Sequence, residues 1–164
     1  MIKTADTYGR PTYNFGRAGI AGMYQKCPEP RAIATLQAGC NAGIRYFDSA
    51  PHNGTGLSEQ RLGQFLESKP CDEVKVSTEV GRLLTPVSPG MAADKGFVGA
   101  LPALVHFDYS HDGIVRSVGD SLMRLGLTQI DIQYVMTSAV LRVGLRHPGI
   151  GPTSWAEGLW FLTG

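Results

Sequence analysis

Three segments of the chain place apolar residues at the spacing of an amphipathic α-helix. The first helix is expected over residues 31–42, opened by Pro30 and ended by Gly43. Ser58 predicts the N-cap of a second helix that continues to residue 66. Ser110 predicts the N-cap of a third helix over residues 112–125, which Gly126 ends. The buried stripes expected on these helices consist of Ile33, Leu36 and Cys40; Leu62, Phe65 and Leu66; and Ile114, Val118, Leu122 and Leu125.

Short apolar segments lie between these helices and are typical of buried strands. Strands are expected over residues 44–48, 74–80 and 130–136, and an irregular first strand with a close turn is expected within the glycine-rich stretch 13–24. Strands that alternate with helices across short connections predict a parallel sheet covered by helices. The fold class is therefore α/β, with about four parallel strands and flanking helices.

Two regions do not follow this alternation. Residues 82–107 are rich in Gly, Pro, Ala and Ser and predict one long loop, whose length is typical of a loop that covers a site. Residues 137–164 carry Trp155 and Trp160 without a clear period, and these side chains fit either an exposed stripe or a cap over an open sheet edge. The chain is therefore divided into a domain over residues 1–136 and a tail over residues 137–164.

The composition fits one globular domain of 164 residues, with 43% hydrophobic and 18% charged residues. A formal net charge of +1 favours neither nucleic acid nor a membrane surface as a partner. Cys27, Cys40 and Cys71 are odd in number and widely spaced, which argues against a disulfide framework and a Cys-x-x-Cys zinc site, and a reducing cytoplasm is the expected location. Neither an export leader nor an apolar stretch of the ~18 residues needed to span a membrane is expected.

The most informative segment, residues 42–54, is typical of a buried strand that delivers Asp48 into a tight loop bounded by Pro51 and Gly54. An acid at the inward end of a strand is where barrel enzymes place their chemistry, so Asp48 is predicted to be a pocket acid. A helix or loop cap is the alternative role. A second group of polar residues lies close together in sequence and consists of His106, Asp108, His111 and Asp112. The spacing of these residues fits no standard metal site and predicts a polar loop and helix cap, so no metal is expected.

Three blocks of the chain together resemble the aldo-keto reductase family. They are residues 42–66 with the loop His52-Asn53-Gly54-Thr55-Gly56-Leu57-Ser58-Glu59, residues 76–84 with Ser77-Thr78-Glu79-Val80-Gly81-Arg82, and residues 107–135 with Asp108-Tyr109-Ser110 and Leu125-Gly126-Leu127. Within the family they look like the branch of the aldose (threo-aldose and fucose) 1-dehydrogenases and pyridoxal 4-dehydrogenase. The resemblance implies the eight-stranded (β/α)8 TIM barrel, which typically needs ~250 residues. A partial barrel, its N-terminal half, is therefore expected here.

The resemblance also implies where the catalytic group lies. The family uses an Asp, a Tyr that donates a proton five residues later, a Lys and a His. Asp48 matches the Asp, whereas Asn53, Glu79 and Met136 occupy the positions of the Tyr, the Lys and the His. Because alternate residues of a strand point to one face, these positions are still expected to share a site. By the same resemblance the cofactor is NADP or NAD, with Asp48 and Met23 as cofactor-binding residues, and the substrate is a small aldehyde or sugar.

These replacements predict an oxidoreductase relative that is inactive or very slow. Glu79 is expected to be a solvated carboxylate at a strand end, and a carboxylate dyad with Asp48 for acid–base or metal chemistry is the alternative. A non-catalytic interaction or regulatory module is the second functional hypothesis, because an open parallel sheet leaves two unpaired edges that can bind a partner or form a homodimer. A truncated gene product is the third.

Overall fold

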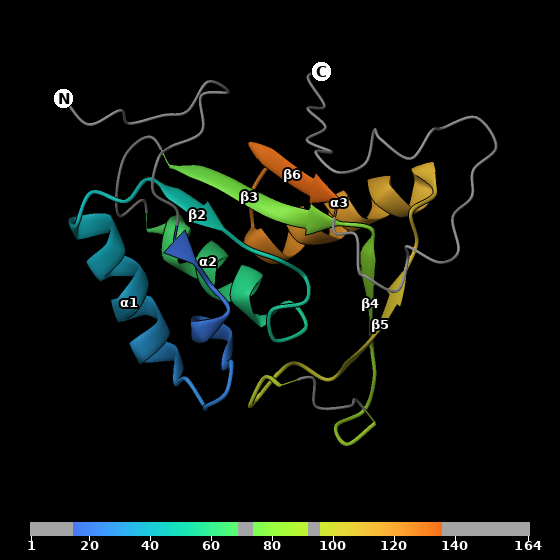
Figure 1. Cartoon of the computed structure of the whole chain (residues 1–164), viewed down its shortest axis with the longest axis horizontal. Helices are drawn as coiled ribbons and strands as arrows, with labels where there is room; N and C mark the ends of the chain where they lie inside the picture. The colour runs from blue at the N-terminus through green and yellow to red at the C-terminus, as the bar shows by residue number, and fades with distance from the viewer. Residues whose placement is uncertain (1–14, 69–73, 92–95, 136–164) are drawn as a thin grey trace, which may run out of the picture.

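The computed structural model describes residues 15–68, 74–91 and 96–135. In this part of the chain a parallel sheet has the strand order β1-β2-β3-β6. Figure 1 shows three helices along one face of the sheet, so the predicted alternation of parallel strands and helices is confirmed. The bounds are β1 Phe15–Gly16, α1 Glu29–Asn41, β2 Tyr46–Asp48, α2 Leu57–Glu67, β3 Lys75–Val80, α3 His111–Leu125 and β6 Ile132–Val135.

Met136, Cys71 and the tail over residues 137–164 lie outside the described residues, so the predictions made for them stay predictions. The irregular first strand is confirmed. It consists of β1 followed by a 3-10 turn, Gly19–Ala21, and by Gly22, whose positive φ of 92° closes the turn.

Aromatic rings join the sheet to the helices. The ring of Phe47 lies 6.1 Å from that of Phe15 and 6.0 Å from that of Phe65, and its side chain is fully buried. Leu36 from α1 and Leu62 from α2 are buried in the same cluster. Burying each such side chain stabilises the fold by about 1.5–3 kcal/mol, so this layer fixes the helices to the strands.

Helix α2 begins differently from the prediction. Gly56, with a positive φ of 95°, precedes the first helical residue, and no side chain caps the helix. Ser58 is instead buried, and its hydroxyl lies 3.2 Å from the hydroxyl of Ser49 in the loop after β2. The expected N-cap role of Ser58 is therefore wrong, because the glycine turn has already started the helix and turned Ser58 inward.

Helix α3 confirms one local prediction and corrects another. The Ser110 hydroxyl accepts a hydrogen bond from the Gly113 N–H at 3.1 Å, as an N-cap does. The buried face, however, is made of small residues together with Leu125, while Ile114, Val118 and Leu122 are only half-buried. Small side chains let α3 approach its neighbours closely. The buried residues of the helix are Gly113, Ser117, Ser121 and Leu125.

The long loop expected over residues 82–107 is a hairpin. Strands β4 (Arg82–Pro86) and β5 (Ala103–Phe107) pair antiparallel, with Arg82 opposite Phe107. Residues 96–102, which precede β5, lie at the site end of the sheet, where the Val98 N–H donates to the Gly22 carbonyl at 2.8 Å and the Leu101 N–H to the Gly54 carbonyl at 3.0 Å. Composition concealed the strands, because turn-forming residues separate them.

Cysteine pairing, metal clusters and membrane helices were also expected to be absent. Cys27 is a free thiol, but Cys40 is disulfide-bonded, which corrects the expectation drawn from cysteine spacing. The cytoplasmic location stays a prediction. Among the described residues, no cluster of His, Cys, Asp and Glu side chains could hold a metal ion. Within the same ranges, no helix combines the length and the apolar character required to cross a bilayer.

Candidate functional site

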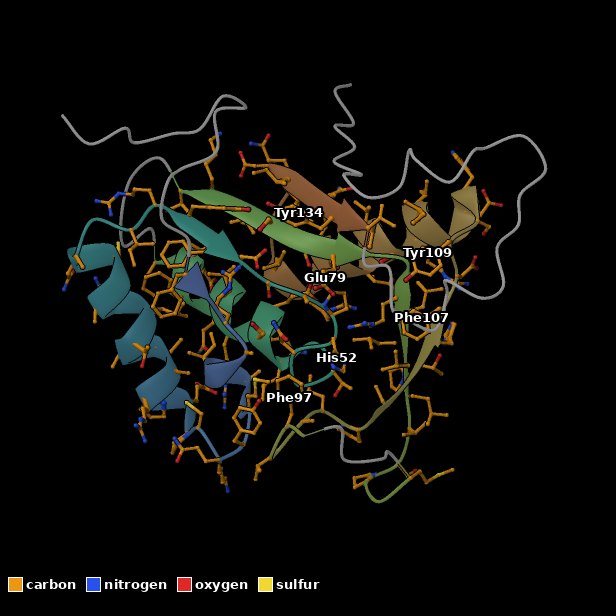
Figure 2. All side chains as sticks on the ribbon, in the orientation of Figure 1. His52, Glu79, Phe97, Phe107, Tyr109 and Tyr134 are labelled. Carbon is orange, nitrogen blue, oxygen red and sulfur yellow. The ribbon has the colours of Figure 1, made fainter. Side chains whose placement is uncertain are left out.

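The inner face of the sheet, opposite the helices, gathers polar side chains from three strands. Asp48 is in register with Ser77 on β3, and Glu79 is in register with Tyr134 on β6. Figure 2 shows Glu79 and Tyr134 on neighbouring strands. Thr78, between Ser77 and Glu79 in sequence, points to the other face and donates to Glu59 of α2. The alternation expected from the sequence therefore places these side chains together.

Asp48 ends β2 and faces this polar group. Its Oδ1 accepts a hydrogen bond from the Ser77 hydroxyl, and its side chain is half-buried. Helix α2, which follows it in sequence, has no side-chain cap, so Asp48 does not take the alternative capping role there. The structure places Asp48 as an acid on the inner face of the sheet.

Two phenols extend the group on the inner face. The hydroxyls of Tyr46 and Tyr134 lie 2.8 Å apart, although the two residues come from β2 and β6. Burial raises the pKa of Tyr46 well above its usual range, and the hydrogen bond to Tyr134 adds to the rise while Ser77 opposes it. Tyr46 is therefore a neutral hydrogen-bonding group at physiological pH.

Glu79 lies at the end of β3 and corrects the expectation of a solvated carboxylate. Its side chain is 21% exposed, and Oε2 lies 3.6 Å from NH1 of the buried Arg82. Burial raises the pKa of Glu79, the nearby Asp48 and Glu59 raise it further, and Arg82 lowers it. Asp48 thus raises the pKa of Glu79, but no third ligand stands with these two carboxyls among the described residues.

The remaining predicted site residues lie in loops at the same end of the sheet. The backbone of Asn53 closes the turn after β2: its N–H donates to the Ala50 carbonyl, and its carbonyl accepts from Ser58. Beside it, the ring of His52 lies edge-on to that of Phe97, 5.4 Å away (Figure 2). Met23 pairs through its backbone with the same Phe97. The hairpin connection therefore lies against both loops that carry Asn53 and Met23.

Two buried charges were missed by the sequence interpretation. Arg17, next to β1, is 1% exposed, and its Nε donates to the backbone carbonyl of Asp48 at 2.7 Å. Glu59, named above only as part of a family motif, is fully buried and pairs with Arg124 at 2.6 Å. The available signal was a charged residue within an apolar stretch, such as Arg17 in residues 15–23.

Residues 14–136 match the model of the aldo/keto reductase family. The chain is 41% identical over 129 residues to D-threo-aldose 1-dehydrogenase from a Pseudomonas species, covering 76% of this chain and 39% of that protein. It is 43% identical over 129 residues to pyridoxal 4-dehydrogenase from Microbacterium luteolum, covering 73% and 37%. The chain thus spans well under half the length of these relatives.

Solved structures agree with the expected partial barrel. The glycerol dehydrogenase of Gluconobacter oxydans superposes with a TM-score of 0.58 at 27% identity, covering 81% of this chain and 37% of that one. A holo-form aldo-keto reductase from Bacillus halodurans superposes with a TM-score of 0.55 at 26% identity, covering 75% of this chain and 35% of that one. The four-stranded sheet with its helices is therefore similar to part of the TIM barrel of these proteins.

Proposed function

Because the chain belongs to the aldo/keto reductase family, we propose that it derives from an NAD(P)-dependent oxidoreductase of aldoses and aldehydes and has itself lost most or all turnover. The observation that supports this is the side-chain chemistry beside Asp48. Asn53 stands where the family has its proton-donating tyrosine, and Glu79 stands where the family has a lysine. The acid is kept without its partners.

Each replacement removes a specific contribution to the reaction. Reducing a carbonyl requires a donor that releases its proton as the alkoxide forms, and the Asn53 amide cannot release one. General acid catalysis is commonly worth ~10²–10⁴ in rate. With Glu79 in place of the family's lysine, Asp48 has a second carboxyl near it instead of a cation. At ~4 Å and an effective dielectric constant of ~20, the attraction that is lost and the repulsion that replaces it are each worth up to about 4 kcal/mol.

The residues present fit an anionic cofactor in one respect. Arg17 lies beside Asp48, and its terminal nitrogens NH1 and NH2 have no hydrogen-bond partner among the described residues. Arg17 would donate to an oxygen of a dinucleotide, and Asp48 would accept from a hydroxyl. A nicotinamide dinucleotide, if bound, would supply hydride transfer.

The proposal is tested by reconstruction with a matched control. The wild-type chain is expected to turn over aldehydes and aldoses with NADPH or NADH slowly or not at all. In the N53Y/E79K/M136H variant we expect a measurable gain, whereas N53F/E79K/M136H, which differs by one phenolic hydroxyl, should gain nothing. Robust wild-type turnover that disappears in Asp48→Asn would refute the proposed loss.

A second function is favoured by the sheet topology. Strands β1 and β6 form the two edges of the parallel sheet in the described part of the chain, and unpaired edges readily pair with another chain. We therefore propose, as the alternative, a non-catalytic module that forms a homodimer or binds a partner. Light scattering across a concentration series decides this: a mass that stays monomeric throughout would exclude the homodimer.

A further inference from the structure

Arg17 is a buried cation whose hydrogen-bonding capacity is largely unused. The guanidinium lies 5.7 Å from the centre of the Phe47 ring, and its Nε donates to the Asp48 carbonyl at 2.7 Å. Within the described ranges, NH1 and NH2 are buried without any acceptor. A guanidinium offers several donors in a planar fork that matches the oxygens of a carboxylate or phosphate.

Nearby carboxylates do not occupy these donors. Asp48 and Glu59 both attract Arg17 electrostatically. The Oδ1 of Asp48, however, accepts from Ser77, and the two oxygens of Glu59 accept from Thr78 at 2.7 Å and Arg124 at 2.6 Å. Among the residues that the structure describes, Arg17 is thus close to two carboxylates but makes no side-chain hydrogen bond with either.

Such an arrangement is energetically unfavourable without a further acceptor. Burial lowers the pKa of Arg17 to about 9, and Asp48 and Glu59 oppose that effect, so the side chain is still a cation at neutral pH. A buried charge whose donors lack acceptors destabilises the folded state. An external oxyanion would recover part of this cost by accepting from NH1 and NH2.

We propose that Arg17 forms an oxyanion-binding site next to Asp48, which takes a phosphate or carboxylate group. The oxyanion comes either from a dinucleotide or from a small free anion. Residue 79 does not supply the family's cation, so the positive charge near the retained acid comes instead from Arg17, which directly follows β1. This site does not require turnover.

Two properties of the site follow from its surroundings. Because Asp48 carries an opposite charge close to Arg17, the pair is nearly neutral and anion affinity is modest. Asp48→Asn should therefore strengthen anion binding, whereas Arg17→Gln should weaken it. Because Arg17 is 1% exposed, binding requires local movement, so association is slower than the ~10⁵–10⁷ M⁻¹s⁻¹ typical of preformed surfaces.

The test measures binding of inorganic phosphate, acetate and NADPH by calorimetry at constant ionic strength. We expect wild-type chain and the control Arg116→Gln, which removes a 59% exposed arginine, to bind alike. Arg17→Gln should lower the affinity for the anion about tenfold or more. Arg17→Lys should retain part of the affinity, because an ammonium group keeps the charge but lacks the planar pair of donors. If Arg17→Gln lowers the affinity for both phosphate and NADPH, the site is a phosphate site. If it lowers the affinity for acetate alone, the site is a carboxylate site.

A second measurement guards against misfolded variants. The Nε–H resonance of Arg17, assigned by its absence in Arg17→Lys, should move on adding the anion that binds. Equal binding by wild type and Arg17→Gln would overturn the proposal. The proposal would also be overturned if the wild-type chain bound none of the three probes and the apolar replacement Arg17→Met were at least as stable as the wild type. Neither outcome depends on turnover, so failure here is distinct from failure of the proposed function.

Discussion

Replacing Glu59 by glutamine removes a negative charge from the interface between α2, β3 and α3 while keeping the side chain's shape. Glu59 is fully buried; it accepts from the Thr78 hydroxyl at 2.7 Å and from Arg124 Nε at 2.6 Å. A glutamine can still accept from Thr78. Arg124, however, would keep only its 3.0 Å contact with the Ser121 hydroxyl and lose its counter-ion.

The expected loss is large for a single substitution. Removing one partner of a buried ion pair typically costs about 3–5 kcal/mol, because the other charge remains in a poorly solvated place. The Arg124 side chain is 15% exposed, so some water reaches it, and the lower end of about 3 kcal/mol is expected. For a chain of this size that corresponds to a fall in Tm of ~6–12 °C.

Urea denaturation followed by far-ultraviolet circular dichroism measures this loss. The matched control is Lys75→Gln, which breaks the 2.8 Å pair with Asp131 where the lysine is 56% exposed; a surface pair should cost below about 1 kcal/mol. Adding Arg124→Met to Glu59→Gln should recover much of the stability, because no charge is then left unpaired. If Glu59→Gln costs no more than Lys75→Gln, the buried pair does not stabilise the interface as argued.

Three further predictions concern the same elements. Because the folded state raises the pKa of Glu79, the protonated carboxyl stabilises the fold most below pH 4.5, and this contribution is lost as the pH rises through the folded-state pKa. Over that pH window the free energy of unfolding of the wild type should therefore fall relative to that of Glu79→Gln. Parallel pH profiles of the two proteins in urea denaturation would contradict this. Ser110→Ala should destabilise α3 by about 1 kcal/mol, measured by the same denaturation, and an unchanged midpoint would exclude capping. Gly63→Ala places a Cβ 2.3 Å from the Leu125 carbonyl oxygen and should lower the free energy of unfolding by ~1–3 kcal/mol. The control Gly119→Ala adds a Cβ that meets nothing within 4 Å and should not destabilise the protein. Similar Tm values for the two variants would refute the close approach of α2 and α3.

The parts of the fold that follow from local rules were predictable. The apolar spacing around Leu36 and Leu62 gave α1 and α2, and Ser110 gave the start of α3. The prediction failed where tertiary contacts decide the outcome. The apolar stripe of α3 suggested Val118 as core, but small residues such as Ser117 face the sheet because close approach of the helix favours them.

The candidate site shows the same division. Strand alternation placed Asp48, Glu79 and their neighbours on one face, and the structure agrees for the described residues. Burial of Arg17 and Glu59 could not be predicted, because each depends on partners that lie far away in sequence, such as Arg124 for Glu59. The exposure of Glu79 was misjudged although its partner Arg82 is close in sequence, because the positive φ of 85° at Gly81 changes the direction of the chain between β3 and β4 (Figure 1).

The strand order also bears on how the polypeptide emerges during synthesis. Each strand of the sheet pairs with one made before it: β2 with β1, β3 with β2, and β6 with β3. Chains leave the ribosome from the N-terminus and can begin to fold as they do so. A nascent chain that stalls after α2 or after α3 would therefore already hold a paired and partly covered sheet, rather than a strand waiting for a later partner.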